Sequence, residues 1–386
     1  MLRERTAALP DVHLTLCLTH DCNLRCSYCY AGAKRPRHMP RDVAERAIEL
    51  ALAKANDRLH LVFFGGEPML RWTELVALTE LAINRGREVG TEIRPTVTTN
   101  GTLLSEDRCA WLAGHGFVLA VSCDGVQEAH DANRVAGDAQ GSHASTWRGL
   151  ERALASGAKV RVILVLHPRN VHLLPASVDA LVAAGADDLV VNPDWSADWS
   201  APELQAAWTE AYERVAERYV HGYREGRPFW ISILDPKIAA YIKGGYGEAD
   251  RCDLGRRNLV VAPSGNLYPC DRMVADDSDP TRVIGHVDTG PNAAAVSRFA
   301  GPRIDLPVDC LGCGVRSRCR NFCACANLAM TGDASVPAPL LCFHEQLCVR
   351  TADDAAEVLF AEENELFVRR HYGSEIVLGR PGPEPT

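Results

Sequence analysis

In the first half of the chain, segments with the hydrophobic pattern of strands alternate with segments that have the hydrophobic spacing of helices. Short apolar runs rich in β-branched and aromatic residues predict strands at His13–Thr19, Leu59–Phe64, Arg94–Thr99, Phe117–Ser122, Lys159–His167 and Asp188–Asn192. Between them, helical spacing predicts helices at Arg41–Ala55, Arg71–Arg85, Ser105–Gly114, Ser145–Ala155 and Val171–Ala184. This alternation indicates a parallel α/β sheet, and six such units predict a partial (βα)6 TIM-like barrel with the strand C-termini at one mouth.

A second region follows the barrel. The amphipathic segment Glu203–Tyr223 is expected to close the barrel, and Pro228 and Pro236 mark a connection after it. We therefore predict an N-terminal extension over residues 1–12, the barrel over 13–235, a smaller cysteine-rich domain over 236–375 and a disordered tail over 376–386.

The composition of the chain limits the cellular compartment and the kinds of binding partner that we expect for the protein. The 386 residues carry a net charge of −9 and are 47% hydrophobic, which is normal for a globular protein and gives no indication of a nucleic acid partner. No run reaches the ~18 apolar residues of a membrane span, and the start is too polar for a secretory signal. We therefore expect a cytoplasmic protein without a membrane partner. Cytosolic thiols stay reduced, so fifteen cysteines indicate metal binding and not disulfides.

Three of these cysteines, Cys22, Cys26 and Cys29, come directly after the first predicted strand. Structural zinc normally takes four protein ligands, so three thiols are one too few. Three thiolates on three irons of a cubane cluster would leave the fourth iron open to a substrate or cofactor. Tyr28 could shield such a cluster from water. For a triplet on its own, zinc binding and chance remain alternatives.

This motif, in the loop after the first barrel strand, resembles the signature of the radical S-adenosylmethionine (SAM) enzymes. The resemblance implies a [4Fe-4S] cluster whose open iron binds the amino and carboxylate groups of SAM. One electron from the cluster would cleave SAM to methionine and a 5′-deoxyadenosyl radical. That radical would then abstract a hydrogen atom from the substrate.

Motifs after the second and third strands are similar to the SAM pocket of this family. The glycine-rich motif after the second strand consists of Gly65, Gly66, Glu67 and Pro68. Glycines let a backbone approach a ligand closely, and the matching family motif contacts the SAM amino group. Thr99 and Asn100 follow the third strand and could serve the ribose. An ordinary turn is the alternative reading of both segments.

The segment after the fourth strand also resembles the family. Ser122-Cys123-Asp124-Gly125 followed by His130-Asp131-Ala132-Asn133-Arg134 matches its S-x-D-G and H-D-x-x-R stretches. The resemblance implies that Ser122 and Arg134 hold the SAM carboxylate, which suits a guanidinium. It also implies that Asp124 lies near the ribose. Arg134 considered alone would be a solvated surface residue.

Two apolar sets have either a binding or a packing role. In the fifth strand, three alternate residues form one face that could pack on adenine or belong to the core, namely Val162, Leu164 and Leu166. After the sixth strand, three aromatic residues could wall a substrate groove or pack the barrel against the next region, namely Trp195, Trp199 and Trp208.

The last third of the chain resembles the SPASM extension of radical SAM enzymes. Its seven matching cysteines are Cys252, Cys270, Cys310, Cys313, Cys319, Cys323 and Cys342, and Val260–Tyr268 reads as a β-hairpin that aims Cys270 inward. A double zinc knuckle is the alternative. The resemblance implies two auxiliary [4Fe-4S] clusters, and therefore three clusters in all. Cys252, Cys270 and Cys323 would bind the first; Cys310, Cys313, Cys319 and Cys342 would bind the second.

The chain departs from the full SPASM pattern at one ligand. Some relatives carry an extra cysteine between the first two, and this chain has none. The first auxiliary cluster would then have an open iron, or would borrow Cys325, Cys348 or Asp253. The three remaining cysteines are expected to be buried small residues, namely Cys17, Cys109 and Cys123.

Asp271 is the candidate catalytic residue. The sequence Tyr268-Pro269-Cys270-Asp271 resembles the anaerobic sulfatase-maturing enzymes, in which the matching Asp is a proposed base near the substrate carbon. A carboxylate shielded from water could accept a proton at neutral pH. A supporting hydrogen bond or helix N-cap is the alternative.

These features predict a radical SAM oxidoreductase that matures a ribosomally made peptide by forming a cross-link, a carbon–carbon bond, an ether or a thioether. Alternatives are a sulfatase maturase that forms formylglycine, a small-molecule dehydrogenase and a non-catalytic iron–sulfur electron carrier. Expected partners are a peptide or protein substrate and an electron donor such as a flavodoxin or ferredoxin. Only about ten residues precede the first strand, so leader recognition would need a separate protein or another surface.

Overall fold

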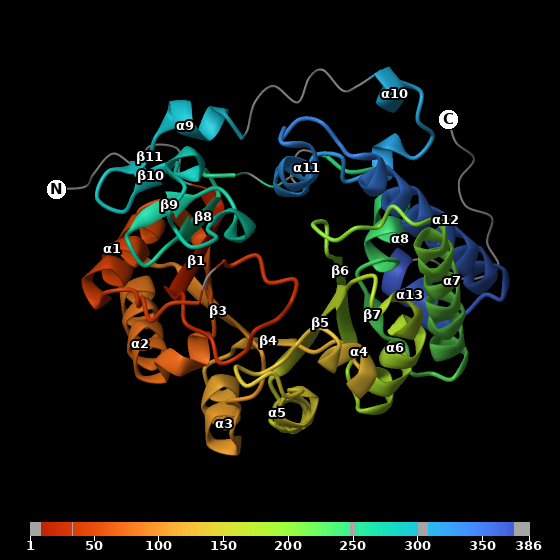
Figure 1. The fold of residues 1–386 in the computed structure, drawn as a ribbon, viewed down its shortest axis with the longest axis horizontal. Helices are drawn as coiled ribbons and strands as arrows, with labels where there is room; N and C mark the ends of the chain where they lie inside the picture. The colour runs from red at the N-terminus through yellow and green to blue at the C-terminus, as the bar shows by residue number, and fades with distance from the viewer. Residues whose placement is uncertain are drawn as a thin grey trace.

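The protein is built on one curved sheet that runs through both halves of the chain. A computed structural model describes residues 9–32, 34–247, 250, 252, 254–299 and 308–373. Within these residues, eleven strands form a single sheet in the order β11-β10-β9-β8-β1-β2-β3-β4-β5-β6-β7 (Figure 1). The helices of the first half lie on the outer side of the curve (Figure 1).

Strands β1 to β6 form the predicted parallel barrel wall, and the predicted fold class is confirmed. The strands are β1 Leu9–Thr19, β2 Ala55–Gly65, β3 Glu92–Thr99, β4 Val118–Ser122, β5 Lys159–Leu166 and β6 Asp188–Pro193. Each pairs in parallel with the next. A seventh strand that the sequence pattern did not indicate, β7 Trp230–Ile231, continues the parallel order beside β6. At two residues it is too short for an alternation to be visible.

The helices that cover the barrel follow the predicted positions. They are α1 Arg41–Leu52, α2 Trp72–Val89, α3 Glu106–Gly114, α5 His143–Ala155, α6 Leu174–Ala183 and α7 Pro202–Arg224. In α1, Val43, Ala47 and Ile48 lie on the buried face, as the helical period requires. Ser105 caps α3 as predicted, because its hydroxyl accepts the backbone N–H of Arg108 at 3.3 Å. A short helix, α4 Gln127–Asp131, was not predicted.

The C-terminal half joins the barrel at both edges of the sheet. The predicted hairpin is present as β8 Asn258–Val261 and β9 Asn266–Tyr268, and β8 also pairs in parallel with β1. Strands β10 Gly285–His286 and β11 Gly290–Pro291 extend this edge. At the other edge, α8 Asp235–Ile242 and α12 Pro339–Ala361 pack together, α12 packs on α7, and α13 Glu365–Tyr372 packs on α8.

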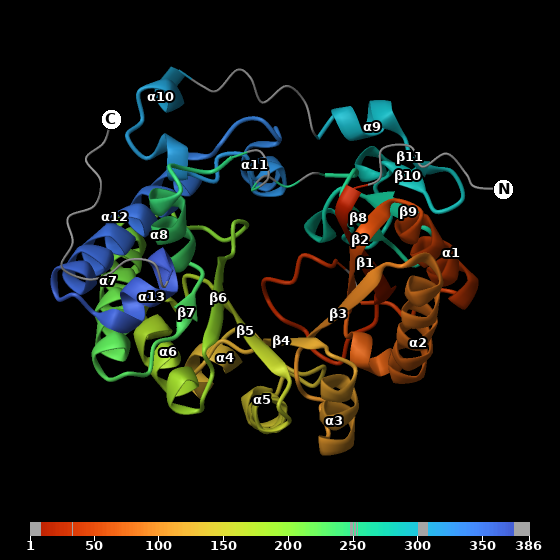
Figure 2. The same ribbon diagram turned by 180° about the vertical axis from the view of Figure 1, so that it is seen from behind.

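Short elements connect these two edges. They are α9 Ala293–Ser297, α10 Val308–Leu311 and α11 Ala324–Thr331. In both views α11 lies between the β8–β11 strands and α12, above the opening of the curved sheet (Figures 1 and 2). Among the helices that the structure describes, none has the length and apolarity that a membrane span requires. The predicted tail over 376–386 lies outside the described residues.

Candidate active site

A cavity of about 390 Å³ opens at the C-terminal ends of the barrel strands. Its barrel wall consists of inward-facing strand residues, namely Thr15, Val62, Phe64, Thr98, Ser122, Ile163, Val165 and Asn192. The C-terminal half contributes a second wall with Asp271, Arg272, Cys325 and Ala329. The cavity therefore lies where the two halves of the chain face each other, at the end of the barrel that usually carries the active site.

Most of the predicted site residues line this one cavity. Those in its wall are Cys22, Cys26, Tyr28, Cys29, Gly65, Gly66, Glu67, Thr99, Asn100, Ser122, Arg134 and Asp271. Pro68 begins a buried 3₁₀ turn, and Asp124 is 2% exposed; neither lines the cavity. The sequence motifs thus converge in space although more than 240 residues separate the first from the last.

The cysteine triplet has the donor set that a cubane cluster with one open iron needs. All three thiols face the same cavity. Within the described residues, no three Cys, His, Asp or Glu side chains meet at a single-ion site, so the triplet does not close around one tetrahedral metal ion. Three separated thiolates around a shared space suit a group that offers each thiolate its own iron. The residues present therefore fit a [4Fe-4S] cluster.

The two glycines after β2 let the cysteine loop pass close to the sheet. The backbone N–H of Gly66 donates to the Thr19 carbonyl at 2.7 Å, and that of Glu67 donates to the Asp21 carbonyl at 2.8 Å. A Cβ atom at Gly66 would lie 1.9 Å from the Asp21 carbonyl oxygen. A ligand was expected at these glycines, but the loop that carries Cys22 makes the close approach here.

Glu67 and Asn100 hold the ends of β2 and β3 together. The buried Glu67 carboxylate accepts the Thr99 hydroxyl at 2.7 Å, the Met69 N–H at 3.0 Å and the Asn100 N–H at 2.8 Å. Burial raises the pKa of Glu67 to about 7. The Asn100 side chain donates to the Asn23 side-chain carbonyl at 2.8 Å, so it too supports the cysteine loop.

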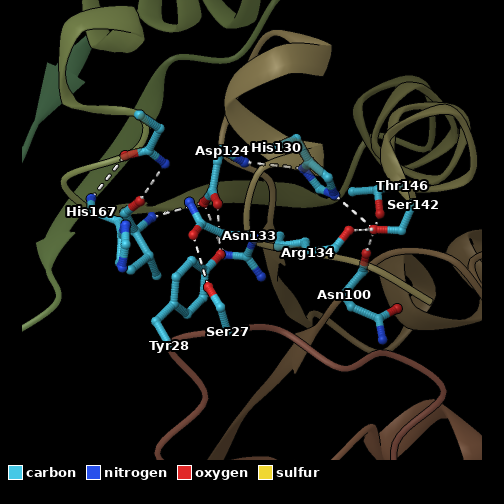
Figure 3. Close-up of polar contacts among 12 residues, drawn as sticks. Ser27, Tyr28, Asn100, Asp124, His130, Asn133, Arg134, Ser142, Thr146 and His167 are labelled. Atoms are coloured by element: carbon cyan, nitrogen blue, oxygen red, sulfur yellow. Dashed lines mark hydrogen bonds and ion pairs between the residues drawn. The ribbon is translucent and has the colours of Figure 1, made fainter. Parts of the chain in front are cut away.

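Arg134, Asp124 and Tyr28 form a connected group in which Asp124 and Arg134 are buried (Figure 3). Asp124 accepts the Arg134 guanidinium at 3.0 Å and the Tyr28 hydroxyl at 2.6 Å. The guanidinium also lies 5.2 Å from the centre of the Tyr28 ring. Arg134 is only 5% exposed, and its buried Nε has no hydrogen-bond partner among the described residues. Asp124 therefore orients the two side chains that reach the cavity wall.

His130 supports this group through contacts of its two ring nitrogens (Figure 3). Its Nδ1 accepts the Asp124 N–H at 3.3 Å, and its Nε2 lies 3.0 Å from the Ser142 hydroxyl, which donates to the Arg134 carbonyl at 2.7 Å. This pattern requires a neutral imidazole with its proton on Nε2. Burial lowers the pKa of His130 to about 3, in agreement with the neutral form.

Asp271 enters the cavity from the C-terminal half. The Tyr30 hydroxyl donates to its Oδ2 at 3.3 Å, and the Cys270 thiol lies 3.1 Å from its Oδ1. Cys270, and not Asp271, is the N-cap residue of the 3₁₀ turn that follows. The helix-cap alternative for Asp271 is therefore wrong.

Seven of the nine C-terminal cysteines gather in two places. Burial and then the neighbouring Cys310 and Cys313 thiols raise the pKa of Cys342. Cys319 lies near Cys342, and burial, Glu345 and Cys342 raise the pKa of its thiol to about 12. The second place holds Cys270, Cys323 and Cys325. Cys252 is exposed, and Asp253 lies outside the described residues.

None of the fifteen cysteines forms a disulfide, and all of them lie among the described residues. Three were expected to be buried small residues, and they are 2% or less exposed, namely Cys17, Cys109 and Cys123. This agrees with the expectation that they fill the core. Burial raises the pKa of Cys123 to about 12, so its thiol stays protonated at neutral pH.

The structure decides between the alternatives that the sequence left open for two sets of apolar residues. Val162, Leu164 and Leu166 lie in the hydrophobic core, and the cavity is lined instead by the opposite face of β5, Ile163 and Val165. Both faces of β5 are apolar, so alternation could not tell which face is inside. Trp195 lines the cavity. Trp199 and Trp208 lie in the core, where Trp199 packs on Trp208 and Trp208 packs on Phe343 of α12.

Sequence reasoning missed several residues of the cavity, and three of them carry functional groups close to the cysteines. Tyr30 and Lys34 follow the triplet, and the Lys34 ammonium lies 2.7 Å from the Cys29 thiol. Arg272 follows Asp271 and lines the same wall. None of the three belongs to a motif that was recognised. Their proximity in sequence to Cys29 and Cys270 was the available signal.

Comparison with known proteins identifies the class. Residues 16–181 match the family model of the radical SAM superfamily. The chain is 26% identical over 325 residues to a serine-type anaerobic sulfatase-maturating enzyme of Klebsiella aerogenes, covering 78% of this chain and 76% of that protein. It is 28% identical over 378 residues to a PqqA peptide cyclase of Rhodopseudomonas palustris, covering 94% of each.

Solved structures share the fold. Native anSMEcpe with bound AdoMet and the Cp18Cys peptide matches with a TM-score of 0.76 at 18% identity, covering 91% of this chain and all of that one. SuiB of Streptococcus suis, bound to its precursor peptide SuiA, matches with a TM-score of 0.59 at 16% identity, covering 88% of this chain and 78% of that one.

The chain therefore carries a radical SAM domain and is a radical SAM enzyme, which works by reductive cleavage of SAM. It uses a [4Fe-4S] cluster and SAM as this class does. The predicted resemblance to the SPASM-type enzymes is confirmed, because the likeness extends through the C-terminal half. The alternative of a non-catalytic electron carrier has no support.

Proposed function

We propose that this enzyme modifies a side chain of a ribosomally made peptide by oxidative radical chemistry. The observation that carries the proposal is the shared cavity, which the Cys22 loop lines on one side and Asp271, Arg272 and Cys325 line on the other. A substrate side chain in this space would lie between the SAM site and the C-terminal cysteines. Two similar proteins support a peptide substrate by name, the PqqA peptide cyclase and SuiB bound to its precursor peptide.

In this proposal the chain's residues hold and orient the reacting groups. Cys22, Cys26 and Cys29 would bind the cluster, which supplies the electron that splits SAM into methionine and a 5′-deoxyadenosyl radical. Arg134 and Ser122 would bind the SAM carboxylate, since both line the cavity and a guanidinium pairs well with a carboxylate. Tyr28 would exclude water from the triplet while Asp124 keeps Arg134 in position.

The C-terminal cysteines would hold two auxiliary [4Fe-4S] clusters, one of which would accept the electron that the substrate radical loses after hydrogen-atom abstraction. With three clusters of four irons each, anaerobically reconstituted protein should contain about twelve irons. About four irons would overturn the assignment of the auxiliary clusters. Cys26→Ala should abolish 5′-deoxyadenosine formation, and undiminished formation would overturn the assignment of the triplet.

Sulfatase maturation is the second candidate function, and Asp271 favours it. This carboxylate lies in the cavity beside the Tyr30 hydroxyl and could remove a proton from the substrate carbon or its side chain. The test is formylglycine formation on a Cys- or Ser-containing sulfatase peptide, measured by mass change. Asp271→Ala should spare SAM cleavage and block product, and normal product would exclude the base role.

A further inference from the structure

Three thiols from two separate segments meet beside the cavity. Cys323 immediately precedes α11 and Cys325 lies in its first turn, and their sulfur atoms are 3.6 Å apart. The Cys325 thiol also lies near the Cys270 thiol, which follows β9. Of these three, Cys325 lines the cavity wall.

The sequence left three candidates for the missing ligand of the first auxiliary cluster, and the structure separates two of them. Cys348 is fully buried in α12, where its sulfur lies 3.5 Å from Nε2 of His344. It therefore faces the packed interior between α7 and α12. Cys325 instead lies against two of the cysteines already assigned to this cluster. The third candidate, Asp253, lies outside the described residues.

A positive charge accompanies this group of thiols. Arg272 lines the same cavity as Cys325, and its guanidinium lies near Cys325, Cys270 and Asp271. Metal-bound cysteines are thiolates, and a neighbouring guanidinium stabilises thiolates. The position of Arg272 therefore suits a set of thiolates that includes Cys325.

We propose that Cys325 is the fourth ligand of the first auxiliary cluster, together with Cys252, Cys270 and Cys323. This inference rests on the auxiliary clusters of the proposed function. Four thiolates occupy every iron, so a peptide in the cavity has no iron of this cluster to bind. The cluster then exchanges electrons with the substrate and does not anchor it. Arg272 is left as the cation of this wall that can contact an acceptor group of the peptide.

The test uses a protein that lacks the SAM cluster, so that only the auxiliary clusters contribute to the electron paramagnetic resonance spectrum. The full chain carrying Cys22→Ala, Cys26→Ala and Cys29→Ala should retain about eight irons, four in each auxiliary cluster. Its reduced form is examined by electron paramagnetic resonance with and without added cyanide or 2-mercaptoethanol. With Cys325 intact, neither compound should change the spectrum, because no iron is open.

Adding Cys325→Ala should open one iron, so that cyanide or 2-mercaptoethanol then shifts one of the two signals. Cys325→Ser, which keeps an oxygen donor, should alter that signal before any addition. Loss of about four irons on Cys325→Ala would likewise support a ligand role. Cys109→Ala, a buried thiol on α3 far from this wall, is the matched control and should behave as the background protein does.

Two results would contradict the inference. One is a spectral shift by cyanide or 2-mercaptoethanol while Cys325 is intact. The other is a Cys325→Ala protein with about eight irons and no response to either compound. Failure of the proposed function would look different, because the background protein would then hold far fewer than eight irons before Cys325 is changed.

Discussion

At the scale of single residues, the site depends on buried polar groups whose partners are fully specified. Glu67 satisfies three donors with two oxygens, and Asp124 accepts from Tyr28, Arg134 and the Val165 N–H. A buried group of this kind costs more when one partner is lost than the bond contributes when it is present. Small chemical changes at these positions should therefore have measurable effects.

Glu67→Gln tests this at the end of β2. A glutamine has one acceptor oxygen, so its amide NH2 must face either the Asn100 N–H or the donors of Thr99 and Met69. We expect the free energy of unfolding to fall by about 1–3 kcal/mol, measured by denaturant unfolding. Glu88→Gln, at an exposed salt bridge of α2, is the control and should change it by less than ~0.5 kcal/mol. Equal effects of the two variants would contradict the role given to Glu67.

His130 predicts a pH dependence of stability. Its folded-state pKa of about 3 lies below the ordinary 6.5. Between these two values, the unfolded chain therefore binds a proton at this residue and the folded chain does not. The stability from the neutral form is complete above pH 6.5 and is lost as the pH falls toward 3. Between pH 7.5 and 6.0, protonation of this residue in the unfolded chain should lower the free energy of unfolding by about 0.8 kcal/mol.

The measurement compares denaturant unfolding of the wild type and His130→Gln at pH 7.5 and 6.0. The variant should lose less stability than the wild type by about 0.8 kcal/mol over this interval. Other buried histidines, such as His13, contribute to both proteins and cancel in the comparison. An identical pH dependence in the two proteins would show that His130 is not held neutral.

At the scale of elements, the segment that carries Cys319 is tied to helices α8 and α12 by one buried ion pair. The Lys237 ammonium on α8 donates to the Glu345 carboxylate on α12 at 2.6 Å and to the Arg318 carbonyl at 2.8 Å. Both side chains of the pair are 3% exposed. The same carboxylate accepts the Arg320 N–H at 2.5 Å. The two members of the pair therefore hold the backbone on both sides of Cys319.

Removing one member of this ion pair should lower the free energy of unfolding strongly, whereas replacing both members with apolar residues should lower it much less. Glu345→Leu leaves a buried ammonium without its counter-ion and should lower the free energy of unfolding by about 3–5 kcal/mol. The double variant Lys237→Met/Glu345→Leu should recover much of that loss, because two apolar side chains replace both charges. Denaturant unfolding of the two variants measures this, and a double variant no more stable than Glu345→Leu would contradict the argument.

The sequence predicted elements whose signal is local and missed relations that are not. The six barrel strands could be found because each has its own apolar run, and Ser105 could be assigned as a cap from its neighbours. The pairing of β8 with β1 joins residues about 245 positions apart, and the apolar run of β8 looks the same with or without that partner. The cavity motifs were found through resemblance, whereas Lys34 and Arg272 belong to no recognised motif.

At the scale of the whole molecule, the two halves share a sheet and are not separable units. Strand β1 pairs with β2 on one side and β8 on the other, so loss of the C-terminal half would expose a long parallel edge. Unpaired edges promote aggregation. The helix α7 would also lose the apolar cover that α12 provides.

A fragment of residues 1–247 should therefore aggregate or fail to form a compact monomer. Size-exclusion chromatography under anaerobic conditions, with the full chain alongside, measures this. A fragment that carries a charged residue in the β1 edge, Leu16→Lys, should be no better folded, because Leu16 is fully buried. A monomeric fragment that still cleaves SAM would show that the barrel is complete without the C-terminal half.

The β1–β8 ladder has a consequence for electron flow. Cys22 lies three residues beyond the end of β1, and Cys270 lies two residues beyond β9, the hairpin partner of β8. Main-chain hydrogen bonds thus connect the two sets of thiols, and side-chain rotations cannot change the separation of their anchors. An electron that tunnels between clusters bound at these thiols would cross a distance set by the rigid backbone. Its transfer rate would therefore not depend on the shape of the bound substrate.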